Sequence, residues 1–443
     1  MSIPGIPGLG QAAAAPTFAA GPATAAASTI HELQANSEWR FEVAFGQSID
    51  VKVLSGTAEI FGTELAEKHT YTFRGTKSSI FTWHGCRLEV SGPCEEYTAE
   101  DTPMVSYVNT HFALEKLRDE AAQNGGEGPR VLVVGPNNAG KTSLVKLLTS
   151  YAIRMGRQPM VINTDSREGL LSIPGSLTAT PFASILDVEQ GWGSSPTSGP
   201  SPVPVKLPLC YYYGLPSPED NAKLFKPVVT RLALAASSRL GVDPVVKGTG
   251  MIIDTPGVIS QGKEGYELIS HIVSEFAVNI ILVLGSERLH SEMNRRFSQS
   301  TSGAVTVVKL DKSGGCVDRD DAFMRHTQEA SIREYFFGDL KRTLINSINP
   351  SFLPGGEAET MDTGLYEKVE PSSMMLHCIL AVMYASLRDS QETIRDATVM
   401  GFVYVAEVDE KKRRMKILVP MNTRITDRPM IWGTWPETTV SLI

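Results

Sequence analysis

The stretch GPNNAGKT, residues 135–142, has the residue types and spacing of a phosphate-binding loop. Its pattern, G-x-x-x-x-G-K-[ST], lets backbone N–H groups close around phosphate oxygens. Lys141 would place its charge on the outer phosphates, and Thr142 would offer a hydroxyl to Mg²⁺. The loop lies between a predicted buried strand at 130–135 and a predicted helix at 140–156, which is the context it requires. We therefore predict a bound nucleoside triphosphate and Mg²⁺.

A second motif, GMIIDTPG at 250–257, ends a predicted buried strand with a carboxylate. Folds that contain a phosphate-binding loop hold the water shell of Mg²⁺ at an Asp in this place. Asp254 is therefore the candidate metal partner of Thr142. The alternative is that Asp254 only caps the turn that follows the strand.

A third stretch, VVKLDKSG at 307–314, contains part of the base-reading motif N-K-x-D of guanine-specific GTPases. Val308 stands where that motif requires Asn, and only Lys309 and Asp311 remain. Together with the DTPG stretch, this remnant makes a GTPase an alternative function. The missing Asn weakens it.

Composition excludes several classes of protein. The net charge of -8 and the pI near 5.6 argue against broad nucleic-acid coating, and no apolar run is long enough to span a membrane. The cysteines are scattered and never spaced as C-x-x-C, so we expect neither a disulfide framework nor a zinc site. A reducing compartment fits this pattern best. They are Cys86, Cys94, Cys210, Cys316 and Cys378.

The chain divides by its patterns into an α/β protein with three folded parts. Short alternating runs closed by Gly between 39 and 103 predict an antiparallel β-sandwich, followed by a helix at 110–123. Alternation of apolar runs and helices from 130 onward predicts a doubly wound P-loop domain. A helix at 374–389 and strands at 399–410 and 413–420 predict a small α+β domain. The expected limits are 1–28 disordered tail, 29–105 sandwich, 106–345 P-loop domain and 346–443 C-terminal domain, with a mobile surface loop at 191–208.

Several stretches, in this order, resemble the polynucleotide 5′-hydroxyl kinase family, and within it the ATP-binding subunit of the eukaryotic pre-mRNA cleavage and polyadenylation factor. The stretches are AEIFGTELA, IFTWHGC, the phosphate-binding loop, SIPGSLTATP, SERL, KSGG and SIREYFFG. The resemblance extends from about residue 30 to the C-terminus. The forms GTELA, DTPG and GFVYVAEVDEKKRRMKILVP are most similar to fungal members.

This resemblance implies that the sandwich folds onto a bound ATP. It places Glu38, which precedes the first predicted strand, WRFEV, and Lys77, which follows YTFRGT, at the adenine end. Without the resemblance, both would be interpreted as solvated charges on the sandwich. The phosphate contacts that it implies are Asn138, Ala139, Gly140, Lys141, Thr142 and Ser143.

The chain departs from the active kinases of this family at three places. Active members carry T-D-x-G-K-[ST] in the loop, where Asn138 replaces the carboxylate. They carry D-x-G-Q after the second strand, where this chain has DSRE at 165–168 and keeps only the candidate base Asp165. Active animal members have a base-stacking Trp where this chain has Val258, and an aliphatic residue gives up a stacking contact of ~1–3 kcal/mol.

Two arginines fit the family's lid pattern, Arg288 and Arg295, although on a helix they could equally form a solvated face. The departures predict retained ATP binding without kinase turnover, so no catalytic residue is expected, and Asp165, Arg288 and Arg295 are vestigial candidates. An active RNA 5′-hydroxyl kinase is the alternative.

The resemblance also implies a setting for the protein. It implies an ATP-binding bridging subunit in the nucleus, required for the endonucleolytic cleavage of polyadenylation-dependent mRNA 3′-end formation. Expected partners are the scaffold subunit that binds the RNA polymerase II C-terminal domain and other cleavage and polyadenylation subunits, with any pre-mRNA contact indirect and no membrane. The run KKRR at 411–414 could be a nuclear signal or phosphate patch, but a solvated hairpin turn is the preferred interpretation.

Overall fold

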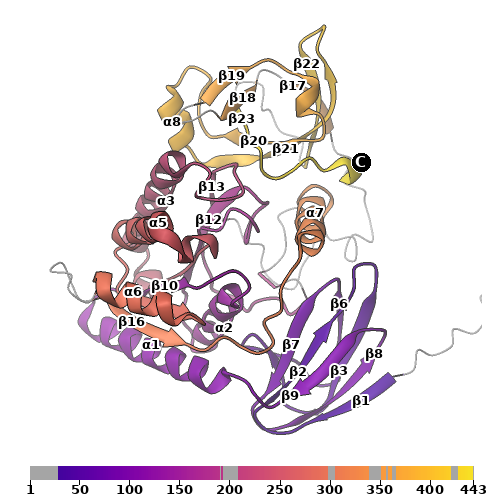
Figure 1. Ribbon diagram of the computed structural model, residues 1–443, viewed down its shortest axis with the longest axis vertical. Coiled ribbons are helices and arrows are strands. Elements are labelled where there is room, and N and C mark those ends of the chain that lie inside the picture. Colours follow the sequence, from indigo (N-terminus) through magenta and orange to yellow (C-terminus); the bar gives the residue numbers. More distant parts are fainter. Residues whose placement is uncertain are drawn as a thin grey trace, which may run out of the picture.

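The computed structural model in Figure 1 places three parts along the chain: a β-sandwich, a central α/β domain and a C-terminal domain. It describes residues 28–189, 191–192, 208–297, 305–338, 351–355, 358–361, 366–420 and 428–442. Almost all of the tail predicted at 1–28 and of the loop predicted at 191–208 lie outside the described residues.

The N-terminal part is an antiparallel β-sandwich, as predicted. Its two sheets have the strand orders β1-β8-β3-β6 and β5-β4-β7-β2-β9. The strands are β1 Ser28–Leu33, β2 Ser37–Glu42, β3 Ser48–Gly56, β4 Glu59–Ile60, β5 Thr63–Glu64, β6 Thr70–Arg74, β7 Lys77–Thr82, β8 Cys86–Ser91 and β9 Glu95–Ala99. The sandwich thus begins before Trp39, where the alternating sequence pattern starts. The pattern did not reveal β1 because this strand lies at a sheet edge and is mostly exposed.

The central part is a doubly wound domain, also as predicted. Its sheet has the order β13-β12-β11-β14-β10-β15-β16, with β11, β14, β10, β15 and β16 parallel and the unpredicted strands β12 and β13 antiparallel at one edge. The strands are β10 Arg130–Val134, β11 Met160–Asn163, β12 Ser176–Pro181, β13 Leu209–Tyr212, β14 Met251–Asp254, β15 Ile280–Leu284 and β16 Thr306–Leu310.

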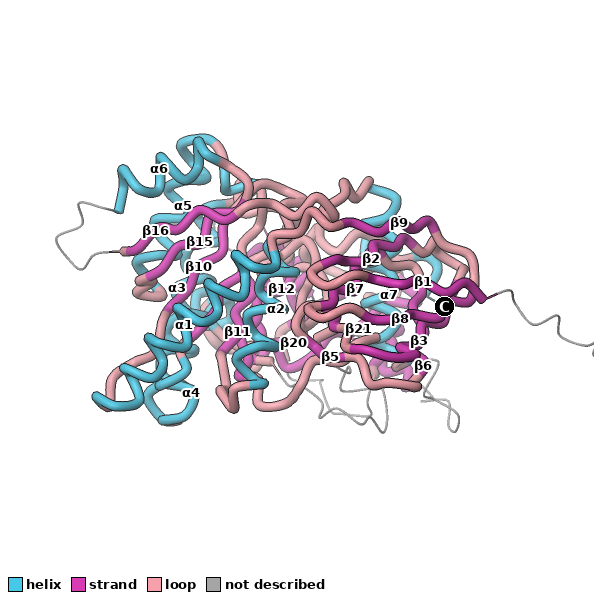
Figure 2. Tube along the Cα trace, turned by 90° about the horizontal axis from the view of Figure 1, so that it is seen from below, coloured by secondary structure: helices cyan, strands magenta, loops and turns pink. Residues whose placement is uncertain are grey.

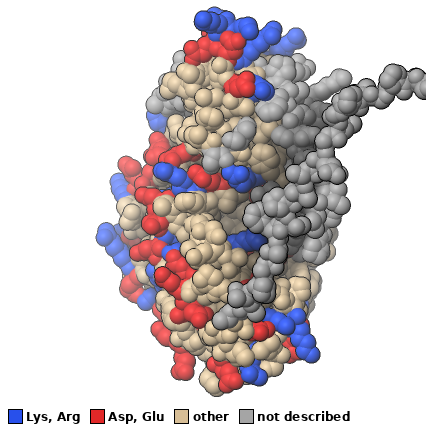
Figure 3. Space-filling model, turned by 90° about the vertical axis from the view of Figure 1, so that its right-hand side faces the viewer, with Lys and Arg blue, Asp and Glu red and all other residues tan. Residues whose placement is uncertain are grey.

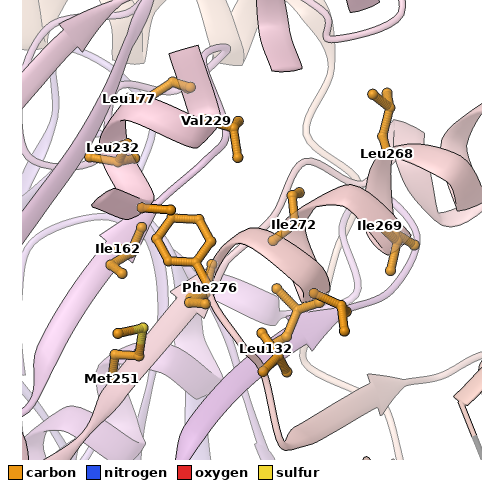
Figure 4. Close-up of a cluster of buried hydrophobic side chains, with 14 of the residues drawn as sticks. Leu132, Ile162, Leu177, Val229, Leu232, Met251, Leu268, Ile269, Ile272 and Phe276 are labelled. Atoms are coloured by element: carbon orange, nitrogen blue, oxygen red, sulfur yellow. The ribbon is translucent and has the colours of Figure 1, made fainter. Parts of the chain in front are cut away.

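Helices cover both faces of this sheet. Helices α1 and α2 lie on the side of the sheet that is nearer the viewer in Figure 2, and α3 and α5 cover the opposite face. Figure 4 shows the core on the second face, where Leu132 and Ile162 of the sheet meet Phe276. The helices are α1 Met104–Asn124, α2 Lys141–Arg154, α3 Ala222–Val242, α4 Pro244–Thr249, α5 Gly262–Glu275 and α6 Glu287–Phe297, with a short 3₁₀ turn η1 at Val258–Ser260.

The C-terminal part is built on a sheet of order β17-β22-β21-β20-β23-β18-β19. Its strands are β17 Ser351–Gly355, β18 Ala358–Met361, β19 Tyr366–Val369, β20 Ile379–Met383, β21 Val399–Asp409, β22 Arg414–Val419 and β23 Met430–Trp432. Short helical elements are η2 Ser373–Met375, α8 Gln391–Asp396 and η3 Val440–Leu442. The basic run at 411–414 lies at the β21–β22 hairpin, as the preferred interpretation required.

The predicted helix at 374–389 is wrong. The chain forms η2 and then the strand β20, which lies between β21 and β23. Alternate residues of β20 enter different cores, because Ile379 and Ala381 pack on one face and Leu380 and Val382 on the other. A strand covered on both faces shows a continuous apolar run, which periodicity cannot distinguish from a buried helix.

Helix α7, Asp321–Phe337, touches all three parts of the chain and stands between the sandwich and the C-terminal sheet in Figure 1. Phe323 packs against Phe45 of the sandwich with ring centroids 5.0 Å apart. Near the other end of the helix, the Tyr335 hydroxyl accepts a hydrogen bond from the Phe402 amide at 3.0 Å. The helix therefore ties the outer parts together beside the central domain.

Helix α2 joins the sandwich to the central domain. Glu59 of β4 is buried, accepts a hydrogen bond from the Tyr151 hydroxyl, and pairs with Arg154 at 3.1 Å. Burial raises the pKa of Glu59. Removing either partner would leave this buried carboxylate unsatisfied. The two contacts therefore hold α2 against β4.

The surface carries mixed charge. Figure 3 shows Lys and Arg interspersed with Asp and Glu over the visible described part of one face, without a broad basic stripe. In the described part of the chain, no helix is long and apolar enough to cross a membrane.

One buried group is expected to make the stability of this fold sensitive to acid. His111 of α1 is 3% exposed, its Nδ1 has no hydrogen-bond partner among the described residues, and its ring lies 5.3 Å from that of Tyr151. Burial lowers the pKa of His111 to about 4; Glu115 opposes this shift, and Arg118 and Arg154 reinforce it.

Because the folded state binds this proton less tightly, stability present above the ordinary pKa of His is lost as pH falls through the folded value. Between about pH 7 and about pH 4.5 we expect the wild type to lose on the order of 2 kcal/mol of stability through His111, and His111→Gln to lack this loss, as measured by urea unfolding. The matched control is His84→Gln, at an exposed position of the sandwich. An equal acid sensitivity of both variants and the wild type would contradict this assignment.

Candidate nucleotide-binding site

The parallel strands bring the chemical groups of the central domain to one edge. The register pairs Val133 of β10 and Asn163 of β11 with Asp254 at the end of β14. The phosphate-binding loop follows β10 and Asp165 follows β11, so both meet Asp254 at the carboxyl ends of the strands. Ligands of open α/β sheets bind at this edge.

A cavity of about 1200 Å³ opens above this edge and is lined by all three parts of the chain. Most of the residues expected at the site line it, namely Glu38, Lys77, Asn138, Ala139, Gly140, Lys141, Thr142, Ser143 and Asp165. Asp254 lies just beneath the lining and reaches the cavity through Thr142. The structure therefore places most of the predicted site residues around one cavity.

The loop has the backbone conformation of a phosphate cradle. Asn138 and Gly140 have positive φ angles of 55° and 85°, and α2 begins at Lys141, so its N-terminal N–H groups face the cavity. The positive φ of Gly140 favours glycine, and a Cβ there would also lie 2.7 Å from Cys316 Sγ. Lys141 folds back over the loop, with Nζ donating to the Pro136 carbonyl at 2.9 Å.

Thr142 and Asp254 form a site suited to Mg²⁺. The Thr142 hydroxyl donates to Asp254 Oδ2 at 2.6 Å, and Asp254 Oδ1 accepts from the Thr255 amide at 3.0 Å. Burial raises the pKa of Asp254 to about 6. Two hard oxygen donors fit Mg²⁺, which takes its remaining ligands from phosphates and water; the described residues contain no larger cluster of metal-binding side chains.

Buried and half-buried charges of both signs surround the loop. Burial lowers the pKa of Lys141. Burial, together with the Glu168 carboxylate, raises the pKa of Asp165. Burial opposes ionisation of Glu168, but hydrogen bonds from Arg319 outweigh it and lower the Glu168 pKa. Such opposed shifts in one cavity mark a functional site.

The two residues expected at the adenine end lie on neighbouring sandwich strands. Glu38 lies within β2, not before the first strand, and it is 4% exposed and paired with Arg40, so it is not a solvated charge. Lys77 begins β7, with Nζ 2.6 Å from Glu42 and 5.2 Å from the Phe323 ring centroid. Their contact with adenine stays a prediction.

The lid arginines lie away from this cavity. Arg288 and Arg295 belong to α6, are exposed, and are not among the described residues that line the cavity. Arg295 pairs with Glu292 one turn earlier at 2.6 Å. In this structure Arg288 and Arg295 therefore belong to a solvated helix face, the alternative interpretation of the lid pattern.

The partial GTPase motif is also placed elsewhere. Lys309 pairs with Glu287, and the backbone carbonyl of Asp311 accepts from the Tyr107 hydroxyl at 2.8 Å. Both residues line a separate groove between α1 and β16. The remnant therefore does not face the phosphate cradle.

Sequence reasoning missed several cations in the cavity, of which Arg319 and Lys146 lie close to the loop and α2. Arg319 lies between β16 and α7 and contacts both Glu168 and Asn138. Lys146 of α2 has its Nζ 5.7 Å from the ring centroids of both Phe61 and Trp192. Lys146 follows Thr142 by one helical turn, so the sequence could have shown that both side chains lie on the same face of α2. Arg319 belongs to no motif that could have revealed it.

Three family models match successive parts of the chain. They are an N-terminal β-sandwich domain of polyadenylation factor at 32–121, an mRNA cleavage and polyadenylation factor CLP1 P-loop at 135–338, and a pre-mRNA cleavage complex II protein Clp1 at 327–437. The mRNA cleavage and polyadenylation factor clp1 of Botryotinia fuckeliana is 74% identical over 99% of both chains.

The chain belongs to the Clp1 family of mRNA cleavage and polyadenylation factors. The corresponding factor of Phaeosphaeria nodorum is 49% identical over 95% of this chain and 97% of its own. The resemblance to a cleavage factor of the polynucleotide kinase-like class is thus confirmed, and the central domain is a nucleotide-binding P-loop domain of the Clp1 type.

Two solved Clp1 structures share the whole fold. A wild-type Clp1p–Pcf11p complex is 31% identical, with a TM-score of 0.84 over 93% of this chain and 98% of that chain. A second describes an extended interface between Pcf11p and Clp1p and the structural basis for ATP loss in a glycine-to-arginine point mutant. It is 30% identical, with a TM-score of 0.84 over 93% and 99% of the chains.

Gly257 of the DTPG stretch offers a test of the cradle's geometry. Its φ of -69° is open to any residue, but a Cβ there would overlap the backbone nitrogen of Asn137 in the phosphate-binding loop. We expect Gly257→Ala to displace the loop and weaken nucleotide binding roughly 10-fold or more, measured by calorimetric titration.

The matched control is Gly248→Ala in α4, where an added Cβ meets nothing within 4 Å. Alanine there is expected to leave binding intact and to stabilise the helix slightly. Nucleotide affinity at the wild-type level in Gly257→Ala would show that this contact does not shape the cradle.

Proposed function

We propose that this Clp1-family chain holds Mg²⁺ and ATP as a structural part of a cleavage and polyadenylation factor, without consuming the ATP. The observation that carries the proposal is the shared cavity, in which the cradle of the central domain faces Glu38 and Lys77 of the sandwich. A ligand with contacts on both parts stabilises their relative placement.

The residues fit that ligand. Lys141 and the first turn of α2 would bind the phosphates, Thr142 and Asp254 would orient Mg²⁺, and Glu38 and Lys77 would contact the adenine end. The metal, when bound, neutralises phosphate charge. ATP loss in a point mutant of the related Clp1p supports ATP as the nucleotide.

We further propose that the chain acts as a bridge in the nuclear complex that cleaves pre-mRNA before polyadenylation. Its partner would be a Pcf11-like scaffold subunit that binds the RNA polymerase II C-terminal domain, with other cleavage subunits attached and pre-mRNA contacted indirectly. The support is that both related structures are complexes of Clp1p with Pcf11p. The cysteines, all free, suit the reducing nucleus.

One observation favours the alternative function, an RNA 5′-hydroxyl kinase. Asp165 lines the cavity, and a half-buried carboxylate with a raised pKa is a suitable general base for a hydroxyl nucleophile. Against it stand Val258 in place of the stacking Trp, and the position of Arg288 and Arg295 outside the cavity. Structural ATP is therefore preferred.

Lys141→Ala tests structural ATP. A ligand that binds only the folded state adds RT ln(1 + [L]/Kd), or ~2.7 kcal/mol at a hundredfold excess. We expect Mg²⁺ and ATP to raise the unfolding temperature of the wild type but not of Lys141→Ala, and the variant to capture less of a Pcf11-like scaffold fragment. Lys263→Ala, on the exposed surface of α5, is the control. Wild-type stability and capture in Lys141→Ala under millimolar ATP would refute the proposal.

A label-transfer assay decides between the two functions. With γ-labelled ATP, Mg²⁺ and a 5′-hydroxyl RNA oligonucleotide, we expect no more labelled RNA from the wild type than from Lys141→Ala. An active family member serves as the positive control. Labelling by the wild type that disappears in both Lys141→Ala and Asp165→Asn would establish the kinase instead.

A further inference from the structure

Arg319 is hydrogen-bonded to the phosphate-binding loop. Its Nε donates to the side-chain oxygen of Asn138 at 3.3 Å. Its two terminal nitrogens bond both carboxylate oxygens of Glu168, one of them at 3.0 Å. The guanidinium thus bridges the loop and the segment that follows β11.

The segment that carries Arg319 is fastened to the same side chain twice. While Arg319 donates to the oxygen of the Asn138 amide, Asp318 accepts from its nitrogen at 3.3 Å. Asn138 can serve both because an amide is a donor at one end and an acceptor at the other. These contacts hold residues 318–319 over the cradle by a side chain.

The charge of Arg319 is coupled to the other charged groups of the cradle. Burial opposes its charge, but the hydrogen bonds and charge of Glu168 raise the Arg319 pKa, with Asp165 and Asp254 contributing. Arg319 in turn is among the charges that lower the pKa of Lys141. The two cations are therefore close enough to repel one another, and an anion between them would relieve this repulsion.

Glu168 binds Arg319 through the paired N–H groups that could bind a phosphate instead. A guanidinium binds a carboxylate or a phosphate with the same parallel pair of N–H groups. The Arg319 side chain is 30% exposed and that of Glu168 27%, so the pair faces the cavity. A terminal phosphate beside Lys141 would compete with Glu168 for one guanidinium.

We propose that Arg319 makes this site selective for a nucleoside triphosphate over a diphosphate, by exchanging Glu168 for the terminal phosphate. The inference rests on the proposed function, because it requires that the cradle binds ATP. Arg167, which also lines the cavity, pairs instead with the exposed Asp321 at 3.3 Å. Arg319 is a specificity-determining residue in this proposal, and no bond is made or broken.

The test compares the Kd values of ATP and ADP, both with Mg²⁺, by calorimetric titration. For Arg319→Ala we expect the Kd of ATP to rise roughly 10- to 100-fold and that of ADP to change less than about 3-fold. For Glu168→Gln we expect the opposite sign, a tighter ATP complex and a larger ratio of the two Kd values, because Arg319 is released from its carboxylate.

The double variant separates this mechanism from a general loss of negative charge. If Glu168 acts through Arg319, Glu168→Gln has no effect on the ratio once Arg319 is Ala. Arg325→Ala and Glu437→Gln are the controls, since these exposed residues form an ion pair at 3.5 Å and belong to neither the loop nor the cavity lining. Both controls are expected to keep the wild-type ratio.

Several results would overturn the inference. Equal weakening of ATP and ADP by Arg319→Ala would make the residue structural, and an unchanged ratio in Glu168→Gln would remove the exchange even if Arg319→Ala failed to fold. Wild-type protein that binds ATP and ADP equally would end the inference but leave the proposed function standing. Wild-type protein that binds neither would end both.

Discussion

The seating of helix α2 is the constraint on which the rest of the structure depends. Its first turn is the phosphate cradle, and its last turns hold the sandwich through Tyr151, Arg154 and the buried Glu59. Because both contacts are on one rigid helix, the distance between cradle and sandwich is set by helix length. The shared cavity follows from this geometry. A nucleotide bound there would connect the two parts a second time, so its loss is expected to lower the free energy of unfolding.

Sequence alone sufficed where a function is encoded by local spacing. The loop at 135–142 follows one apolar strand and Asp254 ends another, and parallel strands end at one edge, so their convergence could be predicted without coordinates. The helix at 374–389 failed because burial on both faces erases the period that distinguishes helix from strand. The antiparallel β12 and β13 were missed because pairing at a sheet edge depends on partners distant in sequence.

Side-chain direction explains the other misses. Arg288 and Arg295 carry a recognisable spacing, yet α6 presents them to solvent, away from the cavity. Arg319 carries no spacing at all, and it reaches the loop only because the connection from β16 to α7 crosses the cradle. Glu168, counted from sequence as a departure from an active motif, has a partner there in Arg319. A substitution that looks like decay in sequence is thus satisfied electrostatically in the fold.

The position of Arg319 also connects the cradle to the rest of the molecule. The next residue, Asp320, caps α7 by accepting from the Phe323 amide at 2.7 Å, and Phe323 packs on Phe45 of the sandwich. At its far end, α7 holds the C-terminal sheet through Tyr335. An exchange of partners at Arg319 therefore acts at the first turn of the helix that joins both outer parts. Under the proposed structural role, a nucleotide that is not consumed would still affect the binding of a partner protein, because its terminal phosphate would bias the placement of surfaces distant from it.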